Sequence, residues 1–598
     1  MGTPPVPAEV LDDLVDLLLA CPAFVGVARA ALAELAAEAE IGYLAAEAER
    51  VTPALVVQRG GLLVRDAAGR TLDVVAQGEF CAPEAGERLD PLEPSLVVWL
   101  PERAIDLAWS APPEEVQRVA LAPARSPIDL QTAAVRTVMR SPVRTAAPEE
   151  DCATVAQRMT RERISSVVVV DPDRVGIVTD RDLRTRLVAQ GRAPDTPVGR
   201  IATYPVRTIA ARTPVFEALI EMLAEGIHHL PVEEDGRLVG MVSSNDLVEL
   251  GTRNPLHLRA ALDRAGDVAA VAGVLADLPA SIEALLAAGT TPGDAGRVIA
   301  TVTDRVHRRV LTLAFAELGE PPSDYGWLVF GSQARREQTL HSDQDHGLVL
   351  PDGLDDGARA WWGELTGWVV AALERCGYAR CRGGVMASSE RWRHDLSGWR
   401  RAFADWIERP TEEHVLDSTI AFDLRTVTGR LRAGSELQPV IARAADHGVF
   451  LARLARDATH HRPPLGFFGG FAVERTGANA GSFDVKSGAM LPIADIARLH
   501  ALAAGDPQIA TDDRLAAAGA SGRLSPELAT TLRAGYELAT GLRLQRHLAQ
   551  HRDGAPPDNW LDPDGLEALA RAQLRETFKA IRLAQQSVAS RYHTGSFG

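Results

Sequence analysis

The chain has 598 residues, too many for one hydrophobic core, because single domains usually hold roughly 100 to 200 residues. Hydrophobic residues make up 46% and charged residues 24%, a globular balance that disfavours long disorder, collagen and coiled coil. The formal net charge of −17 argues against general affinity for nucleic-acid phosphates or for anionic lipid surfaces.

The cysteines and the distribution of apolar residues indicate the cellular compartment of the protein. The five cysteines form no CxxC pair, so they indicate neither a disulfide scaffold nor a zinc finger. The N-terminus is acidic, and the most apolar later stretch, 268–289, is interrupted by Asp277 and Glu283. We therefore expect a cytoplasmic protein with no export and no membrane span.

Residues 1–125 are predicted to form a β-rich domain with flanking helices. A helical start is followed by the strand-like segments ALVVQRGGLLVRD and TLDVVAQGEF, which glycine and aspartate interrupt. The region distantly resembles a cyclic-nucleotide-binding domain, with Gly78-Glu79-Phe80 where that family begins its phosphate-binding cassette. The cassette itself departs from the family, because it reads CAPEAGERLDP and leaves Arg88 in no recognisable register. We predict a degenerate domain with a structural or docking role, with ligand binding as the alternative.

Residues 130–252 contain an internal repeat with an offset of 64 residues. SPVRT at 141–145 recurs as YPVRT at 204–208, and GIVTDRDL at 176–183 recurs as GMVSSNDL at 240–247. Each copy reads as a strand, a helix, two apolar strands and a closing helix. The repeat resembles a tandem CBS pair, the Bateman module, and the resemblance implies a homodimer because such modules commonly pair.

The resemblance also implies a regulatory ligand, an adenine nucleotide such as AMP, ADP or ATP. It maps the adenosine-holding hydroxyl and acid to Thr179 with Asp182, and to Ser243 with Asp246. A carboxylate can accept from ribose hydroxyls, and a helix N-terminus beside it favours phosphate. The alternative is that Asp182 and Asp246 only cap the helices that follow them.

Beyond a predicted helical connector at 253–322, the segment WLVFGSQARREQTLHSDQDHGLVL carries the most informative motif. An apolar strand ends at Gly331-Ser332, and a second strand begins with Asp343-Gln344-Asp345. Alternate strand residues share a face, so Asp343 and Asp345 are expected side by side. Two close carboxylates repel unless a cation lies between them, which predicts a divalent-metal site. Gly331 and Ser332 would hold phosphate oxygens.

This spacing resembles the nucleotidyltransferase superfamily that includes DNA polymerase β. The resemblance implies a core at 323–435 and a third carboxylate on a later strand. Asp423, in LDSTIAFDLRTVTG, is the preferred candidate for catalysis and metal binding, and Asp417 is the alternative. Arg335, ahead of Arg336, would then clamp the triphosphate, although either arginine could instead pair with Glu337.

Longer segments at 381–407, 483–502 and 511–515 extend the comparison. They resemble the nucleotidyltransferase family that carries cyclic-nucleotide-like and CBS domains upstream and is related to the PII uridylyltransferases. The resemblance implies a C-terminal helical domain, 436–598, in which Lys486 contacts nucleotide phosphate. Only two of the 63 basic residues, Lys486 and Lys579, are lysine, so each could mark a place that requires an ammonium group.

Two other motifs have weaker functional interpretations. His394-Asp395 lacks the further ligands of a metal phosphohydrolase and lies in a tryptophan-rich stretch typical of core packing. His460-His461 precedes a loop-like segment and is expected to be solvated.

The sequence thus predicts a multidomain α/β and α+β protein. Its parts are a β-rich cyclic-nucleotide-binding-like domain, a tandem CBS pair, a polymerase β-like nucleotidyltransferase core and a C-terminal helical domain. The predicted function is regulated, Mg²⁺-dependent transfer of a nucleotidyl group from an NTP to an acceptor hydroxyl on a protein, with a PII-like signalling protein as one acceptor. The alternative is a non-catalytic adenine-nucleotide sensor with an inactive transferase fold. Nucleic-acid polymerisation is disfavoured because no basic tract is present.

Overall fold

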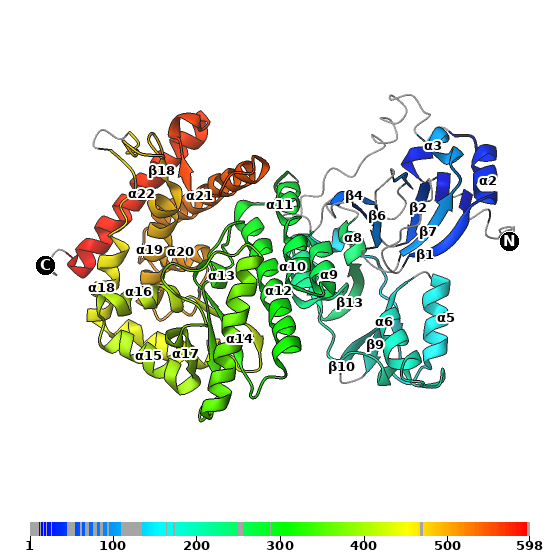
Figure 1. Cartoon of the computed structure of the whole chain (residues 1–598), viewed down its shortest axis with the longest axis horizontal. Helices are drawn as coiled ribbons and strands as arrows, with labels where there is room; N and C mark the ends of the chain where they lie inside the picture. The colour runs from blue at the N-terminus through cyan, green and yellow to red at the C-terminus, as the bar shows by residue number, and fades with distance from the viewer. Residues whose placement is uncertain are drawn as a thin grey trace. The chain divides into compact units, whose positions relative to one another are not determined.

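A computed structural model of the chain defines the architecture. It describes residues 11, 14–15, 17–19, 21–24, 27–44, 54–59, 62–65, 71–75, 80–83, 88–91, 95–108, 134–162, 164–171, 174–248, 255–287, 289–466 and 470–594. Two units are formed, one from 1–261 with 287–290 and the other from 262–286 with 291–598. Each unit is taken by itself below (Figure 1).

The N-terminal region of the first unit is built on two antiparallel sheets. Their strand orders are β1-β7-β2-β5 and β4-β3-β6. The elements are η1 (Pro22–Phe24), α2 (Arg29–Ala37), β1 (Glu40–Leu44), β2 (Ala54–Arg59), β3 (Leu62–Arg65), β4 (Thr71–Val75), β5 (Phe80–Cys81), β6 (Arg88–Pro91), β7 (Ser95–Leu100) and α3 (Arg103–Leu107). The apolar face of α2 packs on the first sheet through Leu32 and Leu35, which share a core with Val56 and Val98. A β-rich region with flanking helices is present, whereas Gly78 and Glu79 lie outside the described residues.

The repeated region follows as two small sheets with strand orders β10-β9-β8 and β11-β12-β13. The first copy comprises η2 (Val135–Thr137), β8 (Thr145–Ala146), α5 (Cys152–Glu162), β9 (Ser166–Asp171), β10 (Arg174–Thr179), α6 (Asp180–Asp182) and η3 (Leu183–Val188). The second comprises η4 (Val198–Arg200), β11 (Ile209–Ala210), α7 (Val215–Glu225), β12 (His229–Glu234), β13 (Arg237–Ser243) and α8 (Ser244–Val248).

Equivalent positions of the two copies meet each other. Ser165 Oγ lies 2.8 Å from His229 Nε2, and these two residues are 64 positions apart, the offset of the sequence repeat. The two glycines of the repeat allow close crossing of the copies, because a Cβ at Gly176 would lie 2.5 Å from the Tyr204 ring and one at Gly240 2.5 Å from Met139 Sδ. The predicted repeat is therefore present in the fold, with its glycines at the contacts between the copies.

A helical segment leads into the second unit. It contains α9 (Leu256–Arg264), α10 (Val268–Leu275), α11 (Leu278–Ala287) and the 27-residue α12 (Pro292–Leu318). Among the described residues, 268–287 is the one stretch that is long and apolar enough to cross a membrane, and 39% of its apolar window is buried. The structure divides this stretch into α10 and α11, and α10 contacts α12 and α14 (Asp356–Arg375). The predicted connector is thus largely incorporated into the second unit.

The core of the second unit is a four-stranded sheet with the order β16-β15-β14-β17. The strands are β14 (Gly326–Phe330), β15 (His346–Leu350), β16 (Arg393–Asp395) and β17 (Leu424–Gly429), and only β15 and β16 pair in parallel. All residues of β14 and β15 are buried, which explains their continuous apolar sequence. The helices around the sheet are α12, α13 (Gly331–Arg335), α14, η5 (Glu390–Trp392), α15 (Leu396–Glu408) and α16 (Glu412–Ala421).

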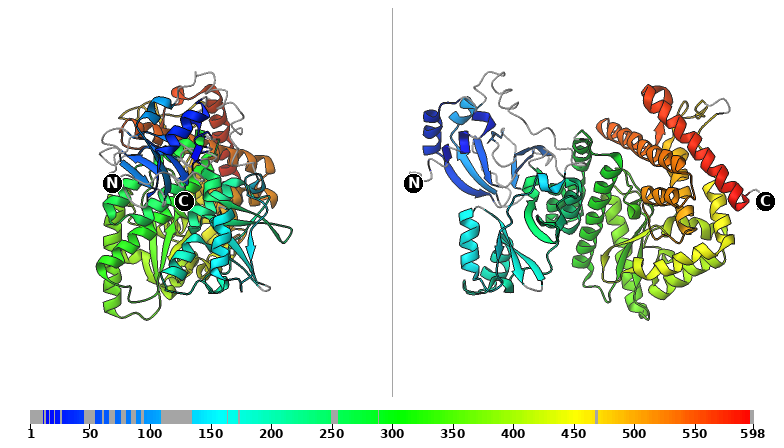
Figure 2. Two further views of the ribbon diagram at one scale, coloured as in Figure 1. Left: turned by 90° about the vertical axis from the view of Figure 1, so that its right-hand side faces the viewer. Right: turned by 180° about the vertical axis from the view of Figure 1, so that it is seen from behind.

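The remaining chain is helical, apart from a small two-stranded sheet of β18 (Phe483–Asp484) and β19 (Trp560–Leu561). Its helices are α17 (Ala433–Ala442), η6 (Arg443–Asp446), α18 (Gly448–Ala458), η7 (Lys486–Met490), α19 (Leu491–Leu502), α20 (Thr511–Ala520), α21 (Pro526–Arg552), η8 (Pro563–Gly565) and α22 (Ala568–Tyr592). The long helices α21 and α22 contact each other and are seen in orange and red in Figure 2.

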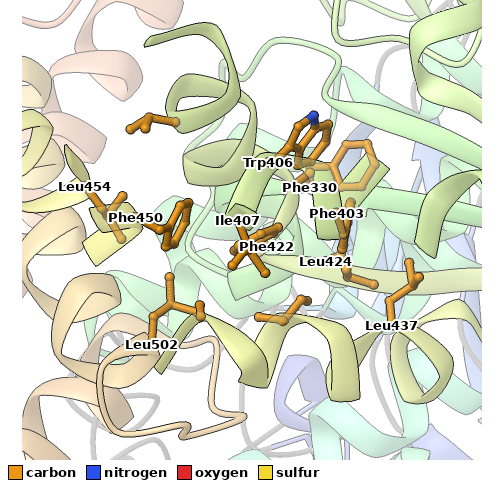
Figure 3. Packing of buried hydrophobic residues seen from close by; sticks show 14 of the residues in the cluster. Phe330, Phe403, Trp406, Ile407, Phe422, Leu424, Leu437, Phe450, Leu454 and Leu502 are labelled. Carbon is orange, nitrogen blue, oxygen red and sulfur yellow. The ribbon is translucent and has the colours of Figure 1, made fainter. Parts of the chain in front are cut away.

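One hydrophobic core joins the sheet to these helices. Figure 3 shows Phe330 and Leu424 from the sheet packed with Phe403 of α15, Phe450 of α18 and Leu502 of α19. The predicted domain boundary at 435/436 therefore crosses the interior of a single core, although it separates two stretches of different composition.

Candidate active site

The loop after β14 brings the backbone close to the pocket. Gly331 has a φ of +54°, a left-handed conformation that glycine adopts without the strain a Cβ would cause. This conformation turns the chain from β14 into the short helix α13, and the Gly331 amide donates to the Asp423 carbonyl at 3.1 Å. Ser332, the next residue, lines the pocket, as the sequence predicts.

Asp343 and Asp345 lie on one side of the chain just before β15. The residue between them points the opposite way, since the Gln344 amide group donates to the carbonyls of Val370 and Tyr378 inside the core. Asp343 is exposed and Asp345 is half-buried, and both line the pocket. The two aspartates therefore face the same pocket, as predicted, but the second strand begins at His346 rather than at Asp343.

The pocket is an open cavity with about 470 Å³ of empty volume. It is formed by residues of α13, the segment between α13 and β15, and the helices η7, α19 and α21. Its lining residues are Ser332, Arg335, Glu337, Ser342, Asp343, Asp345, Lys486, Met490, Leu491, Tyr536 and Arg543. Carboxylates and cations thus face the same small space.

The acidic side of the pocket suits a divalent cation. Burial raises the pKa of Asp345 to about 6, and the neighbouring Asp343 carboxylate acts in the same direction. A cation between the two groups would relieve this repulsion, and carboxylate oxygens are the ligands that Mg²⁺ prefers. Among the described residues, however, no three His, Cys, Asp or Glu side chains are grouped closely enough to hold a metal together.

Asp423, the predicted third carboxylate, does not line the pocket. It is fully buried and is absent from the residues that line the pocket. Its Oδ2 accepts from Arg335 Nη1 at 2.7 Å and from Arg498 Nη2 at 2.8 Å, and its Oδ1 lies 2.7 Å from Arg514 Nη2. Burial alone would raise the pKa of this carboxyl, but the guanidinium groups of Arg498, Arg514 and Arg335 hold it well below its usual range. The predicted site of three carboxylates is therefore wrong for Asp423, because this acid binds Arg335, Arg498 and Arg514 instead.

Asp417, the alternative third acid, is also elsewhere. It lies within α16 rather than on a strand, and its carboxylate accepts from Arg391 Nε at 3.1 Å. It has no place in the pocket lining.

Arg335 lines the pocket, but its predicted role as a triphosphate clamp is not supported by its contacts. Its Nε donates to Glu337 Oε2 at 2.7 Å and its Nη1 donates to Asp423. Glu337 in turn accepts from the Thr511 backbone and from the Tyr536 hydroxyl at 2.7 Å. The pairing with Glu337 left open by the sequence is present, but it is buried rather than on the surface.

Lys486 reaches the pocket from η7, as the resemblance implied. Burial and the neighbouring Arg543 lower the pKa of its ammonium group, whereas Asp343 and Asp345 act in the opposite direction. The second lysine, Lys579, is on the surface and pairs with Glu576 at 2.8 Å. Of the two lysines, only Lys486 is therefore at the candidate site.

Several pocket residues were missed from the sequence. Tyr536 and Arg543 lie on α21, more than 190 positions from the Asp343–Asp345 motif, in a helix with no recognisable local motif. Ser342 immediately precedes Asp343 and could have been included on position alone. Only the packing of α21 against the site identifies the two helical residues.

The two weaker motifs have structural roles. Asp395 accepts from the Gly398 amide at 2.7 Å and caps α15, while His394 contacts the Trp399 ring. The rings of His460 and His461 contact each other edge to face, away from the residues that line the pocket.

The predicted adenosyl-ligand residues form the same structure in both CBS copies. The Thr179 hydroxyl donates to Asp182 Oδ2 at 2.7 Å, and the Ser243 hydroxyl donates to Asp246 Oδ2 at 2.6 Å. In each copy the hydroxyl oxygen also accepts from the backbone N–H of the acid at 3.3 Å. Helix capping is therefore present at both positions, and a role in ligand binding remains a prediction.

Family comparisons agree with this layout. Residues 276–413 match the family described as "Putative nucleotidyltransferase DUF294", and residues 448–592 match the associated "Putative nucleotidyltransferase substrate binding domain". CBS domains match at 135–189 and 198–252. The chain belongs to the family of nucleotidyltransferase proteins that combine these domains.

Individual relatives match part of the chain. An uncharacterized protein of Methanopyrus kandleri is 35% identical over 125 residues, which cover 20% of this chain and 64% of that protein. The mitochondrial CBS domain-containing protein CBSX3 of Arabidopsis thaliana is 36% identical over 97 residues, or 15% of this chain and 47% of that protein. The match therefore spans less than two thirds of these curated relatives.

Solved structures match over a similar share of the chain. An uncharacterized conserved protein of Pyrococcus horikoshii is 30% identical and covers 20% of this chain and 92% of its own, with a TM-score of 0.19. A CBS domain protein of Pyrobaculum aerophilum complexed with AMP is 28% identical and covers 19% of this chain and 90% of its own, with a TM-score of 0.18.

Proposed function

We propose that the second unit is a Mg²⁺-dependent nucleotidyltransferase that moves a nucleotidyl group from an NTP to an acceptor hydroxyl. The observation that carries the proposal is the pairing of Asp343 and Asp345 across one pocket from Lys486. In such a pocket the carboxylates can bind a divalent metal ion, and the lysine ammonium group can bind phosphate. A metal–triphosphate substrate requires both interactions.

Each residue has a defined task in this proposal. Asp343 and Asp345 would hold Mg²⁺ or Mn²⁺, while Gly331, Ser332 and Lys486 would position the phosphates. A bound divalent cation supplies charge neutralisation at the phosphate oxygens during in-line displacement. The acceptor oxygen forms a bond to the α-phosphorus, the bond from that phosphorus to the bridging oxygen breaks, pyrophosphate leaves, and the hydroxyl proton passes to solvent. Arg335 contributes indirectly by holding Glu337 beside the pocket.

The acceptor and the regulation extend the proposal. Following the resemblance to PII uridylyltransferases, we take the acceptor to be a protein hydroxyl, with a PII-like signalling protein as one case. The CBS pair would bind AMP, ADP or ATP at Thr179 with Asp182 and at Ser243 with Asp246, and would mediate a homodimer in the cytoplasm. The same hydroxyl–acid pair recurs in both copies, so the proposal gives each copy one equivalent adenylate site.

A second candidate function follows from Asp423. Because this acid is bound by three arginines, Asp343 and Asp345 are left without the third metal-binding carboxylate that the superfamily uses, and this favours a sensor that binds nucleotide without turnover.

One experiment tests both functions. The purified protein and its Asp343→Ala/Asp345→Ala variant are incubated with Mg²⁺, each of four labelled NTPs and a lysate, with adenylates as added activators. Label on a macromolecule that requires both carboxylates supports the transferase. NTP binding by calorimetry without any label under all conditions contradicts the transferase and leaves the sensor.

A further inference from the structure

Four buried arginines of the second unit and the half-buried Lys486 fall into two groups. Arg335, Arg498 and Arg514 all contact the Asp423 carboxylate, and Arg498 also pairs with Asp495 at 2.6 Å. Among the described residues, by contrast, no carboxylate lies within 4.0 Å of the Arg543 guanidinium or of the Lys486 ammonium group. The first group is neutralised within the protein, and the second is not.

Arg543 is the more unusual member of the second group. It is 6% exposed, its Nε donates to Asn559 Oδ1 at 2.7 Å, and its side chain lines the pocket. Burial lowers the pKa of this guanidinium to about 10. Removing a charged group from water without an opposite charge costs free energy, so an unpaired buried arginine is unexpected in a merely structural position.

The two cations and the two carboxylates share the pocket but come from different parts of the unit. Asp343 and Asp345 precede β15, whereas Lys486 is on η7 and Arg543 is on α21. Asp343 acts electrostatically on both Lys486 and Arg543, which places the charges of opposite sign near one another without direct pairing.

A ligand that carries both charges would satisfy both sides. A divalent cation neutralises the carboxylates, and a polyphosphate chain places several anionic oxygens beside it. Arginine and lysine are both suited to phosphate, with arginine offering a fork of donors and lysine a point charge.

We propose that Arg543 and Lys486 form a polyphosphate subsite, supplied entirely by the C-terminal helices, that binds the phosphate tail of the nucleotide. The inference rests on the proposed function for the identity of that ligand. It also assigns to Arg543 the phosphate-binding role that the sequence suggested for Arg335.

The test measures binding of inorganic tripolyphosphate to the full-length protein by calorimetry in metal-free buffer. Arg543→Gln is expected to weaken binding by about tenfold to a hundredfold, the usual value of one charge-assisted hydrogen bond. Lys486→Met is expected to weaken it similarly. The matched control is Arg533→Gln on the same helix, whose exposed side chain pairs with Asp512 and which should bind as the wild type does. Equal affinity in Arg543→Gln and the wild type would overturn the subsite.

A stability measurement separates binding from structure. Arg543→Gln should keep or raise the midpoint of ligand-free thermal unfolding, because it removes an unpaired charge, while Arg498→Gln should lower it strongly. A drop for Arg543→Gln as large as that for Arg498→Gln would make Arg543 a structural residue and overturn the inference.

The outcomes also separate the subsite from the transferase. An Asp343→Asn/Asp345→Asn variant should lose transfer but still bind tripolyphosphate, since the subsite cations remain. A wild-type protein that transfers nucleotide but does not bind tripolyphosphate overturns the subsite alone. One that binds tripolyphosphate through Arg543, yet transfers nothing from any NTP, supports the subsite and contradicts the proposed function.

Discussion

The Arg498 guanidinium and the Asp423 carboxylate are 2.8 Å apart, and neither side chain is more than 4% exposed. The carboxylate belongs to the residue before β17, and the guanidinium belongs to α19, so the pair links the sheet to a C-terminal helix. Arg514 of α20 and Arg335 of α13 complete the coordination of Asp423. This carboxylate therefore holds together the elements next to the pocket, because one of its partners, Arg335, lines it.

Removing this charge is expected to destabilise the protein. Asp423→Asn leaves three buried guanidinium groups without their shared carboxylate, a loss of about 3–5 kcal/mol by analogy with other broken buried pairs. Denaturant unfolding measures the change, with Asp324→Asn as the control because its pair with Arg430 is exposed. An Asp423→Asn protein with wild-type stability and no transferase activity would instead indicate a metal ligand.

The paired carboxylates should respond to Mg²⁺. If Mg²⁺ binds at Asp343 and Asp345, a concentration of 100 times its Kd stabilises the protein by about 2.7 kcal/mol, which raises the unfolding midpoint. Asp343→Asn/Asp345→Asn should lose this shift and should be at least as stable as the wild type without metal, because the repulsion is gone. An unchanged Mg²⁺ response in the double variant would place the ion elsewhere.

A buried histidine predicts acid sensitivity. His307 is 2% exposed, its Nδ1 accepts from Trp327 Nε1 at 2.8 Å, and burial lowers its pKa from 6.5 to about 4. The unfolded chain therefore binds a proton below about pH 6.5 that the folded chain does not bind until about pH 4. Stability from this group is constant above pH 6.5 and falls by about 3 kcal/mol as the pH drops to 4.

His307→Gln tests this assignment, because its amide oxygen can still accept from Trp327 while the titrating group is removed. Unfolding free energies of both proteins are measured from pH 7 to pH 4. The variant should lose less stability on acidification than the wild type. Parallel pH curves would show that His307 does not contribute.

The CBS sites give a fourth prediction. Asp182→Ala removes a helix-capping carboxylate, which costs about 0.5–2 kcal/mol, and should also weaken AMP binding measured by calorimetry. Asp151→Ala is the matched control, since Asp151 Oδ1 accepts from the Thr154 amide at 2.6 Å in the same module. Equal AMP binding by both variants would leave Asp182 with a capping role only.

The parts of the site that follow from local sequence were predicted well. Asp343 and Asp345 share a face because the segment just before β15 alternates as a strand does, with Gln344 bridged to Arg380. The Gly331-Ser332 turn is needed where a buried strand meets a helix. The two CBS copies were also predicted, because similar segments recur in the sequence at a constant offset of 64 residues.

Other features depend on residues distant in sequence. The partners of Asp423 include Arg498, 75 positions away, so nothing in LDSTIAFDLRTVTG shows that this acid is already paired. Arg543 lies in a long helix with no recognisable local motif, and only the folded chain shows that its charge is buried and unpaired.

The core in Figure 3 limits the movements that the proposed regulation by adenylate could use. Phe422, beside the sheet, and Phe450, on α18, have ring centroids 6.0 Å apart and are almost fully buried. Moving the C-terminal helices away from the sheet would expose many such side chains to water, at a free-energy cost of about 1.5–3 kcal/mol each. This total is far larger than the coupling free energy of one bound adenylate. Under this proposal the core must stay packed during regulation. The movements whose free-energy cost is small enough are small shifts of η7 and α21, the helices whose residues line the pocket.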